Sequence, residues 1–160
     1  MGAEMAVRRA TAADAAELGR MQRAFVAHHE ALDPHMRFNR AVTDSFQETV
    51  PGLLAEGRHL LLVADPGTGR LAGFLWAMVR ENPPMLLPPA YGYIVQTWTE
   101  EAARRRGVAA RMVEEARAWF RQQGLDVVKL HVLHRNPGGR AFWQAQGFDE
   151  FFHELWHDLA

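Results

Sequence analysis

The chain has 160 residues, of which 48% are hydrophobic and 23% charged, a composition typical of a globular domain and unlike that of a disordered chain. The formal net charge of -1 provides no overall field for nucleic acid or an acidic membrane, so an anion site must be local. The absence of cysteine excludes disulfides, thiolate zinc sites and cysteine nucleophiles, and no apolar run suits a membrane span or a signal peptide. We therefore expect a cytoplasmic protein with one domain over residues 1–160.

The first half of the chain predicts one strand, two helices and a hairpin. Residues 5–10 form the strand, and Thr11-Ala12-Ala13-Asp14 has the pattern of a capping box that opens a helix ending at Asp33-Pro34. A second helix is expected near 43–56, where Pro51-Gly52 shortens or kinks it. Residues 59–64 and 71–79 predict two strands, and the turn residues at 65–69 between them predict antiparallel pairing.

Strands and helices alternate in the second half. A loop with four prolines at 82–89 precedes a strand at 91–99, and apolar residues at helical spacing predict a long helix from 108 to Gly124. A buried strand at 127–133, a helix at 138–146 and a final aromatic-rich strand at 148–159 follow. Crossover helices require parallel pairing and the hairpin requires antiparallel pairing, so the predicted fold class is α/β with a mixed sheet flanked by helices.

An arginine-glycine turn lies between the strand at 91–99 and the following helix. A helix N-terminus presents unpaired amide N–H groups and the positive end of the helix dipole, so it attracts phosphate oxygens. Gly107 and Ala109 would let a phosphate approach the backbone, while Arg104, Arg105 and Arg106 add charge. The turn alone supports either an anion site or a solvated basic turn.

A second segment favours the anion site, because the two together resemble the signature of the GCN5-related N-acetyltransferase (GNAT) superfamily. The family's Q/R-x-x-G-x-G/A turn is matched by Arg104, Gly107 and Ala109. Its Asn and the Gly-Phe pair that follows a helix are matched by Asn136 and Gly147-Phe148. The resemblance in element order covers nearly the whole chain and implies a largely antiparallel sheet splayed between its fourth and fifth strands. It also implies an acetyl-CoA-dependent N-acetyltransferase that acetylates a primary amine of a small molecule or peptide by direct attack.

The resemblance also implies which residues hold CoA. The end of the family's fourth strand pairs with the pantetheine arm, and Thr97, Trp98 and Thr99 occupy that place here, although Thr99 replaces the usual aliphatic residue. The amides of the turn and of the first helical residues are expected to bind the pyrophosphate, and the Asn136 side chain is expected to contact the pantetheine. The residues of the turn are Arg104, Arg105, Arg106, Gly107, Val108, Ala109 and Ala110.

His131 and Tyr93 are the catalytic candidates. An alkylammonium must lose a proton before it can attack a thioester, and an imidazole suits that task near neutral pH. His131 occupies a position that carries a catalytic carboxylate in many family members, and Tyr93 lies where others place a base or relay. Trp143, which the resemblance places at the cofactor, replaces the tyrosine that often protonates the leaving thiolate in the family, and its indole N–H cannot replace that acid because it does not titrate in range. Unless Tyr91 or Tyr93 reaches the sulfur, the thiolate leaves unaided or takes a proton from water. In the family, the first helices and nearby loops shape the acceptor site, which here implies His28, His29, Asp33 and Glu81.

Two alternative functions remain open. His153-Glu154-Leu155-Trp156-His157 matches the H-E-x-x-H pattern of zinc hydrolases, but the acetyltransferase interpretation makes this segment a strand and expects no metal site. The other alternative is a regulatory module that binds CoA without efficient catalysis, which the replacement at Trp143 supports. The aromatic residues of the same final segment are also a candidate contact for a homodimer.

Overall fold

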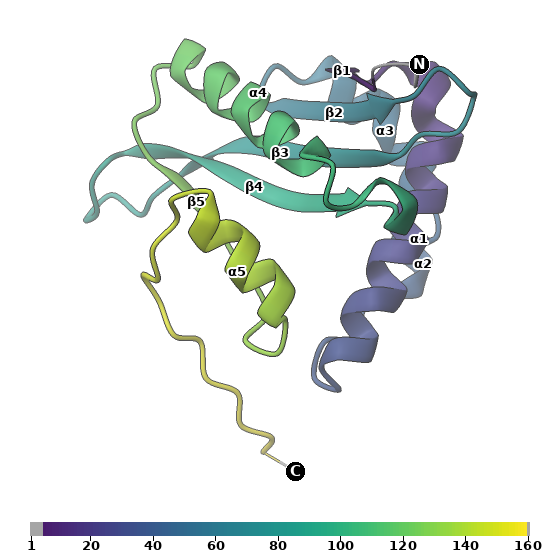
Figure 1. The fold of residues 1–160 in the computed structure, drawn as a ribbon. Coiled ribbons are helices and arrows are strands. Elements are labelled where there is room, and N and C mark those ends of the chain that lie inside the picture. The colour runs from purple at the N-terminus through teal and green to yellow at the C-terminus, as the bar shows by residue number, and fades with distance from the viewer. Residues whose placement is uncertain (1–4, 160) are drawn as a thin grey trace.

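Five strands form one sheet in the computed structural model, which describes residues 5–159 (Figure 1). The strands are β1 (Ala6–Arg9), β2 (His59–Asp65), β3 (Gly73–Glu81), β4 (Ala90–Thr99) and β5 (Val128–Leu130). They lie in the order β1-β2-β3-β4-β5, with antiparallel pairing throughout except between β4 and β5, which are parallel. The predicted mixed, largely antiparallel sheet is confirmed.

Helices cover both faces of this sheet. They are α1 (Ala15–Leu32), α2 (Arg40–Thr43), α3 (Phe46–Ala55), α4 (Val108–Gln122) and α5 (Pro137–Ala145), with short 3-10 turns η1 (Ala12–Asp14) and η2 (Glu101–Ala103). Alternating side chains of β2 explain the two layers. Leu60 and Leu62 pack in the same core cluster as Met112 of α4, whereas Leu61 packs with Met21 of α1 on the other face. Figure 1 shows α4 in front of the sheet and α1 and α3 behind it.

The capping box predicted from the sequence opens the first helical segment. The Thr11 backbone N–H donates to Asp14 Oδ2 at 2.7 Å, and Arg8 donates to both carboxylate oxygens of Asp14, at 2.8 and 3.0 Å. Arg8 also donates to Asp65, at 2.7 Å, and so links β1, β2 and the start of the helix. Asp14 is buried, and the hydrogen bonds from Arg8 lower the pKa of its carboxyl.

We expect Asp14→Ala to lower the free energy of unfolding by about 2 kcal/mol at neutral pH, because it removes hydrogen bonds to charged groups. Since the folded-state pKa of Asp14 lies below its unfolded value of about 4, its contribution is present above pH 4 and is lost as the pH falls through the folded-state pKa. Urea denaturation at pH 7 and at pH 3 measures both effects. Asp126→Ala, at an exposed carboxylate, is the control. A loss of unfolding free energy in Asp14→Ala that is equally large at both pH values would contradict the linkage.

Two predictions for the last third of the chain are wrong. The strand expected at 127–133 extends only over Val128–Leu130, because its pairing with β4 ends at Leu130. The final strand expected at 148–159 does not form: within the described part of the chain, residues 148–159 belong to no helix or strand. The other elements agree with the predictions to within a few residues. No helix among residues 5–159 is long and apolar enough to cross a bilayer.

Candidate functional site

The strands β4 and β5 separate partway along β4. Their paired residues are Gly92 with Val128, Tyr93 with Lys129 and Ile94 with Leu130, whereas β4 continues to Thr99. The register between β3 and β4 also shifts at Trp76, where a β-bulge leaves Val95 unmatched. The last residues of β4 therefore have a strand neighbour on the β3 side alone, and the other edge is open to a ligand.

Polar side chains at this open end are buried without partners. Among the described residues, Gln96 Oε1, Thr97 Oγ1, Trp98 Nε1 and Thr99 Oγ1 are buried and make no hydrogen bond. Leaving a buried polar group unsatisfied costs about 1–3 kcal/mol, and such groups are uncommon in folded proteins. Since successive side chains of a strand point to opposite faces, both faces at this end of β4 carry polar groups that lack a partner.

The arginine-glycine turn follows directly and leads into α4. Arg105 and Gly107 have left-handed backbone conformations, with φ of 61° and 73°, and Gly107 is the N-cap residue of α4. No group in residues 5–159 accepts a hydrogen bond from the amides of residues 105–110. Two left-handed residues beside a helix N-terminus give these amides the arrangement that suits an anion.

Arg104 and His28 connect the turn to the open strand. Arg104 Nε donates to the Thr99 carbonyl oxygen at 3.0 Å, and its guanidinium lies 5.1 Å from the centroid of the Trp98 ring. The His28 ring of α1 lies 5.5 Å from the same tryptophan. Burial and, to a lesser extent, the charge of Arg104 lower the pKa of His28, which favours its neutral form. The structure therefore brings His28, predicted for the acceptor site, beside the predicted cofactor strand.

Tyr93 and His131 meet where β4 and β5 part. The Tyr93 hydroxyl lies 3.0 Å from His131 Nδ1, and the two rings are edge-on with centroids 5.6 Å apart. Tyr93 is buried, and this burial raises the pKa of its phenol, so the hydroxyl is neutral at physiological pH. His131, by contrast, is exposed and is the first residue after β5. The two catalytic candidates thus form one hydrogen-bonded pair that reaches solvent through the histidine.

Asn136 and Trp143 have structural contacts in addition to their predicted roles. Asn136 Oδ1 accepts from the Gly139 N–H at 2.9 Å and caps α5. Its amide nitrogen is therefore the part of the side chain that suits a ligand. Trp143 packs edge-on between Phe142 and Phe148, with ring centroids 4.9 and 5.3 Å away, which anchors the residues after α5.

The other residues predicted for the acceptor site are more scattered. His29 Nδ1 lies 2.8 Å from the Phe25 carbonyl oxygen within α1, and burial lowers its pKa. Asp33 pairs with His35 at 3.0 Å and with Arg135 at 3.6 Å, so it links the end of α1 to the loop before α5. Glu81 pairs with Arg58 and lies opposite Ala90, at the end of β4 remote from Thr99.

The zinc interpretation loses its geometric basis. The H-E-x-x-H pattern places two histidines on one helical turn, but His153 and His157 lie in a segment without helix. No group of three or more His, Cys, Asp or Glu side chains in residues 5–159 is arranged to hold a metal ion.

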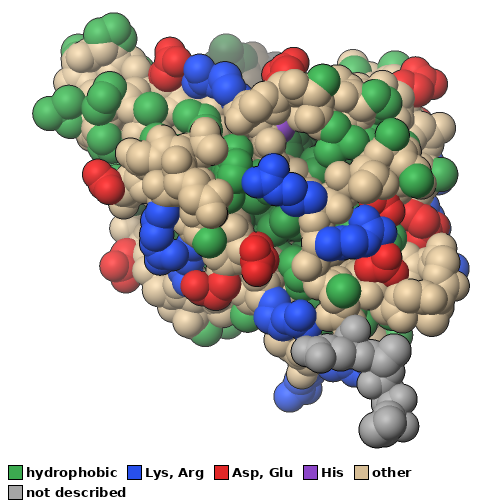
Figure 2. Space-filling view, turned by 90° about the horizontal axis from the view of Figure 1, so that it is seen from above, with side chains coloured by type: hydrophobic (Ala, Val, Ile, Leu, Met, Phe, Trp, Pro, Cys, Tyr) green, Lys and Arg blue, Asp and Glu red, His purple; other side chains and the backbone are tan. Residues whose placement is uncertain are grey.

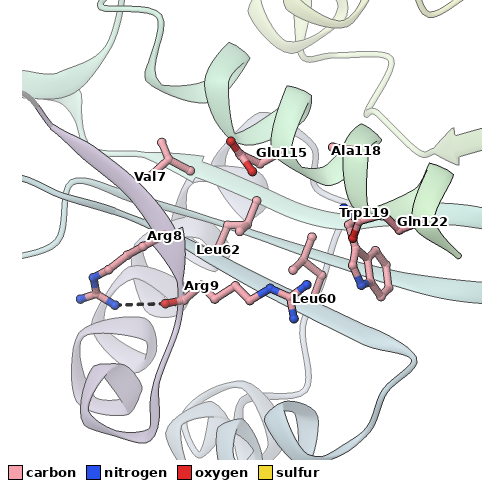
Figure 3. Close-up of a pocket in the computed structure, with 9 residues that line it drawn as sticks. All are labelled: Val7, Arg8, Arg9, Leu60, Leu62, Glu115, Ala118, Trp119 and Gln122. Carbon is pink, nitrogen blue, oxygen red and sulfur yellow. Dashed lines mark hydrogen bonds between the residues drawn. The ribbon is translucent and has the colours of Figure 1, made fainter.

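The pocket in Figure 3 lies away from the open strand. Its lining includes Val7 and Arg9 of β1, Leu60 of β2 and Trp119 of α4, and its volume is about 120 Å³. Because β1 and β5 form opposite edges of the sheet, this pocket is separate from the site. A larger hollow of about 360 Å³ lies beside the turn, between η2 and the β2–β3 hairpin, and Arg106 contributes to its lining. In Figure 2, acidic and basic side chains are interspersed over the visible face, which therefore lacks a continuous basic surface.

Two contacts at the site were not predicted from the sequence. Arg80 of β3 lies over the Tyr93 ring, 3.8 Å from its centroid, and Arg20 of α1 pairs with Glu100 at 2.5 Å, directly after Thr99. The spacing of Glu17 and Arg20 indicates a local pair, which also forms. No sequence pattern indicates the partner 80 residues away.

Comparison with known families gives one match of high coverage. The model described as the acetyltransferase (GNAT) family matches residues 23–148, which include the open strand, the turn, the Tyr93–His131 pair and Asn136. No curated protein matches the sequence of the chain.

Several solved structures share the fold. A tetramutant of the BH1408 protein from Bacillus halodurans superposes with a TM-score of 0.80 at 19% identity, covering 97% of this chain and 100% of that one. The aminoglycoside N-acetyltransferase AAC(6')-Iy in complex with CoA has a TM-score of 0.80 at 16% identity, covering 99% and 96%. The aminoglycoside 6'-N-acetyltransferase AAC(6')-IG from Acinetobacter haemolyticus has a TM-score of 0.76 at 19% identity, covering 98% and 99%. At these identities the likeness shows a common fold.

Proposed function

The chain belongs to the acetyltransferase (GNAT) family and is an N-acetyltransferase that uses acetyl-CoA and an amine acceptor, and from this premise we propose that a single domain over residues 1–160 acetylates a primary amine of a small molecule or peptide by direct attack. The observation that carries the proposal is the Tyr93–His131 pair at the point where β4 and β5 separate. A group able to accept a proton thus lies beside an edge that is open to the thioester.

The residues present fit acetyl-CoA. The open edge of β4 at Thr97, Trp98 and Thr99 offers backbone groups to the amides of the pantetheine arm, in the manner of an added strand. The free amides of residues 105–110 suit the pyrophosphate, with Arg104, Arg105 and Arg106 supplying charge. The amide nitrogen of Asn136 and the indole of Trp143 border the same arm. Acetyl-CoA supplies the activated acetyl group and a thiolate leaving group.

His131 is proposed as the base that makes the acceptor amine nucleophilic. In this assignment the Nδ1–H of His131 donates to the Tyr93 oxygen, which leaves the lone pair of Nε2 free to take the ammonium proton. Tyr93 is a positioning residue, held by its burial and by Arg80 over its ring. Direct attack needs no enzyme nucleophile, and the chain has no cysteine that would carry the acetyl group as a thioester. The departing thiolate, from a thiol with a pKa of about 8.5, takes a proton from water.

The acceptor site is proposed to lie between the end of α1 and the Tyr93–His131 pair. His28 and His29 of α1 would contribute to this acceptor site, together with Asp33 at the C-terminal end of α1. Glu81 lies further along β3, where it is suited to contact only an extended acceptor such as a peptide. The neutral histidines and the carboxylate suit an acceptor that presents an ammonium group.

An acceptor screen tests this function. Thiol release from acetyl-CoA is followed with amines, aminoglycosides, amino acids and peptides, and each acceptor is compared with its N-acetylated form. We expect release with at least one free amine and none with its acetylated control. Tight acetyl-CoA binding without release for any acceptor would contradict the proposal and would favour the CoA-binding regulatory module, which the tryptophan at position 143 also suits.

A further inference from the structure

Arg80 of β3 and Lys129 of β5 are half-buried, and within the part of the chain that the structure describes neither pairs with an acidic side chain. The other half-buried arginines each form an ion pair with a carboxylate; they are Arg8, Arg20, Arg117 and Arg140. Removing a charged group from water is unfavourable unless an opposite charge or hydrogen bonds replace the solvent. These two cations are therefore suited to an anion.

The groups that contact the two cations are neutral. The Arg80 guanidinium lies 3.8 Å from the centroid of the Tyr93 ring, and Lys129 Nζ lies 4.0 Å from that of the Tyr91 ring. Lys129 Nζ also donates to Asn82 Oδ1 at 3.0 Å. An ammonium has three donors, and a guanidinium that lies over a ring keeps donors at its edge, so both groups retain N–H donors for a ligand.

Both cations lie on the face of the sheet that carries the catalytic pair. A Cβ at Gly92 would lie 2.6 Å from the Phe120 ring of α4, so Gly92 faces α4 and the tyrosines on either side of it face the opposite way. Lys129 is paired with Tyr93 across β4 and β5, and His131, two residues further along, contacts the same tyrosine. The face opposite α4 is the one that α1 covers, and the acceptor site is proposed there.

The acidic segment after α5 does not neutralise the two cations. Its Phe151 ring lies 5.8 Å from Lys129 Nζ, and the same segment brings Glu154 near Tyr93. Burial is the main cause of the raised pKa of Tyr93, and the charge of Glu154 is a smaller one. Glu154 is exposed and, among the described residues, forms no ion pair with either cation. An anion for Arg80 and Lys129 would therefore come from a bound molecule.

We propose, building on the function proposed above, that the acceptor is a small amino acid whose carboxylate binds to Arg80 and Lys129 while its amine is acetylated beside His131. The carboxylate accepts hydrogen bonds from both cations, and the planar guanidinium suits its two oxygens. The Tyr93 ring lies under Arg80 and its hydroxyl holds His131, so the carboxylate and the amine are a few bonds apart.

The transfer itself is unchanged by this choice of acceptor. The amine nitrogen bonds to the acetyl carbon as the C–S bond breaks, one ammonium proton goes to His131, and a second reaches the thiolate through water. The N-terminal amine of a peptide has an amide where the amino acid has its carboxylate, and the several ammonium groups of an aminoglycoside are repelled by both cations. Both are therefore expected to be poorer acceptors.

Selectivity between an amino acid and its carboxamide tests the inference. kcat/KM is measured for straight-chain amino acids of increasing length, each beside its carboxamide, which keeps the amine and removes the negative charge. We expect the amino acid to be preferred at least about tenfold, the effect of hydrogen bonds to a charged group. Since the carboxamide has the less basic amine, its amine is more often neutral, so basicity does not explain such a preference. Equal acetylation of acid and amide would overturn this inference and leave the proposed function intact.

Arg80→Gln and Lys129→Gln identify the groups that bind the carboxylate. Each should lower the preference for the amino acid at least about fivefold, and Arg80→Lys should retain part of it. Arg58→Gln is the matched control, because this arginine already pairs with Glu81, and it should leave the preference unchanged. A loss of kcat/KM that is equally large for acid and amide would show that these residues act on the catalytic pair alone, and would contradict the carboxylate site.

Binding of the N-acetylated products separates a failure of this inference from a failure of the proposed function. Isothermal titration calorimetry of the CoA-loaded chain with an N-acetyl amino acid, its carboxamide and the corresponding phosphonate requires no turnover. Binding of the acid at least about tenfold tighter than the amide, without acetylation of any acceptor, would support the carboxylate site and contradict the proposed function. Equal affinities for acid and amide would overturn the site, and tighter binding of the phosphonate would overturn the choice of a carboxylate.

Discussion

Ala109→Glu is expected to raise the dissociation constant for acetyl-CoA by about 100-fold or more while leaving the fold intact. Ala109 lies in the first turn of α4, among the free amides of residues 105–110. A carboxylate there meets the same amides that suit the pyrophosphate, so it competes with the ligand and repels its charge. A hundredfold loss corresponds to about 2.7 kcal/mol of binding free energy. Isothermal titration calorimetry with acetyl-CoA measures it directly.

Thermal unfolding separates this effect from a loss of structure. An acidic side chain in the first turn of a helix is stabilising, so the variant should unfold at the same or a higher temperature than the wild type. Gln122→Glu, at the exposed far end of the same helix, adds an equal charge away from the turn and should bind acetyl-CoA normally. Unchanged affinity in Ala109→Glu would place the pyrophosphate elsewhere and remove the turn from the site.

His131→Ala is expected to lower turnover about 100-fold at neutral pH, the lower end of what general bases contribute, without weakening acetyl-CoA binding. The side chain is exposed, and among the described residues its polar contact is the hydrogen bond to Tyr93, so truncation should cost little stability. Without the base, attack depends on acceptor molecules that are already neutral, a fraction that rises about tenfold per pH unit below an amine pKa of about 10, so the deficit in turnover of the variant should shrink as the pH rises. Initial rates from pH 6 to 9 at saturating acetyl-CoA measure both effects, and an unchanged profile would exclude His131 as the base.

The same profile measured for Tyr93→Phe and for the double variant tests the positioning role of the tyrosine. If Tyr93 acts through His131, Tyr93→Phe lowers turnover and displaces the pH profile in the presence of the histidine, and has little further effect in its absence. Equal losses in both backgrounds would show that Tyr93 acts independently.

The motifs whose residues act through their own backbone were predictable from the sequence because their spacing is local. Gly107 adopts the left-handed conformation that an anion-binding turn requires, and Thr11 and Asp14 form the predicted capping box. The separation of β4 from β5 was implied by resemblance to the GNAT superfamily and is confirmed by pairing that ends at Ile94 and Leu130. Residue spacing along the sequence is therefore enough to predict a feature whose residues act through their own backbone.

Features that depend on distant partners were not predictable in the same way. The Tyr93–His131 hydrogen bond follows from the parallel register of β4 and β5, and the position of Arg80 over Tyr93 follows from the register of β3 and β4. The prediction of a final strand was wrong because alternating apolar residues at 148–159 give strand propensity but do not determine whether a neighbouring strand is there to pair with. Strand formation requires backbone hydrogen bonds to a neighbouring strand, and residues 149–159 make none with a described backbone group.

Direct acetyl transfer at the open end of β4 is the central claim, and initial rates over a grid of acetyl-CoA and acceptor concentrations test it most directly. The acceptor is the most active amine from the screen, and the analysis compares reciprocal plots at several fixed concentrations of acetyl-CoA. Direct attack requires both substrates to be bound together, so the lines should intersect. Parallel lines, together with acetylated enzyme detected by mass spectrometry in the absence of acceptor, would show a covalent intermediate and contradict the mechanism.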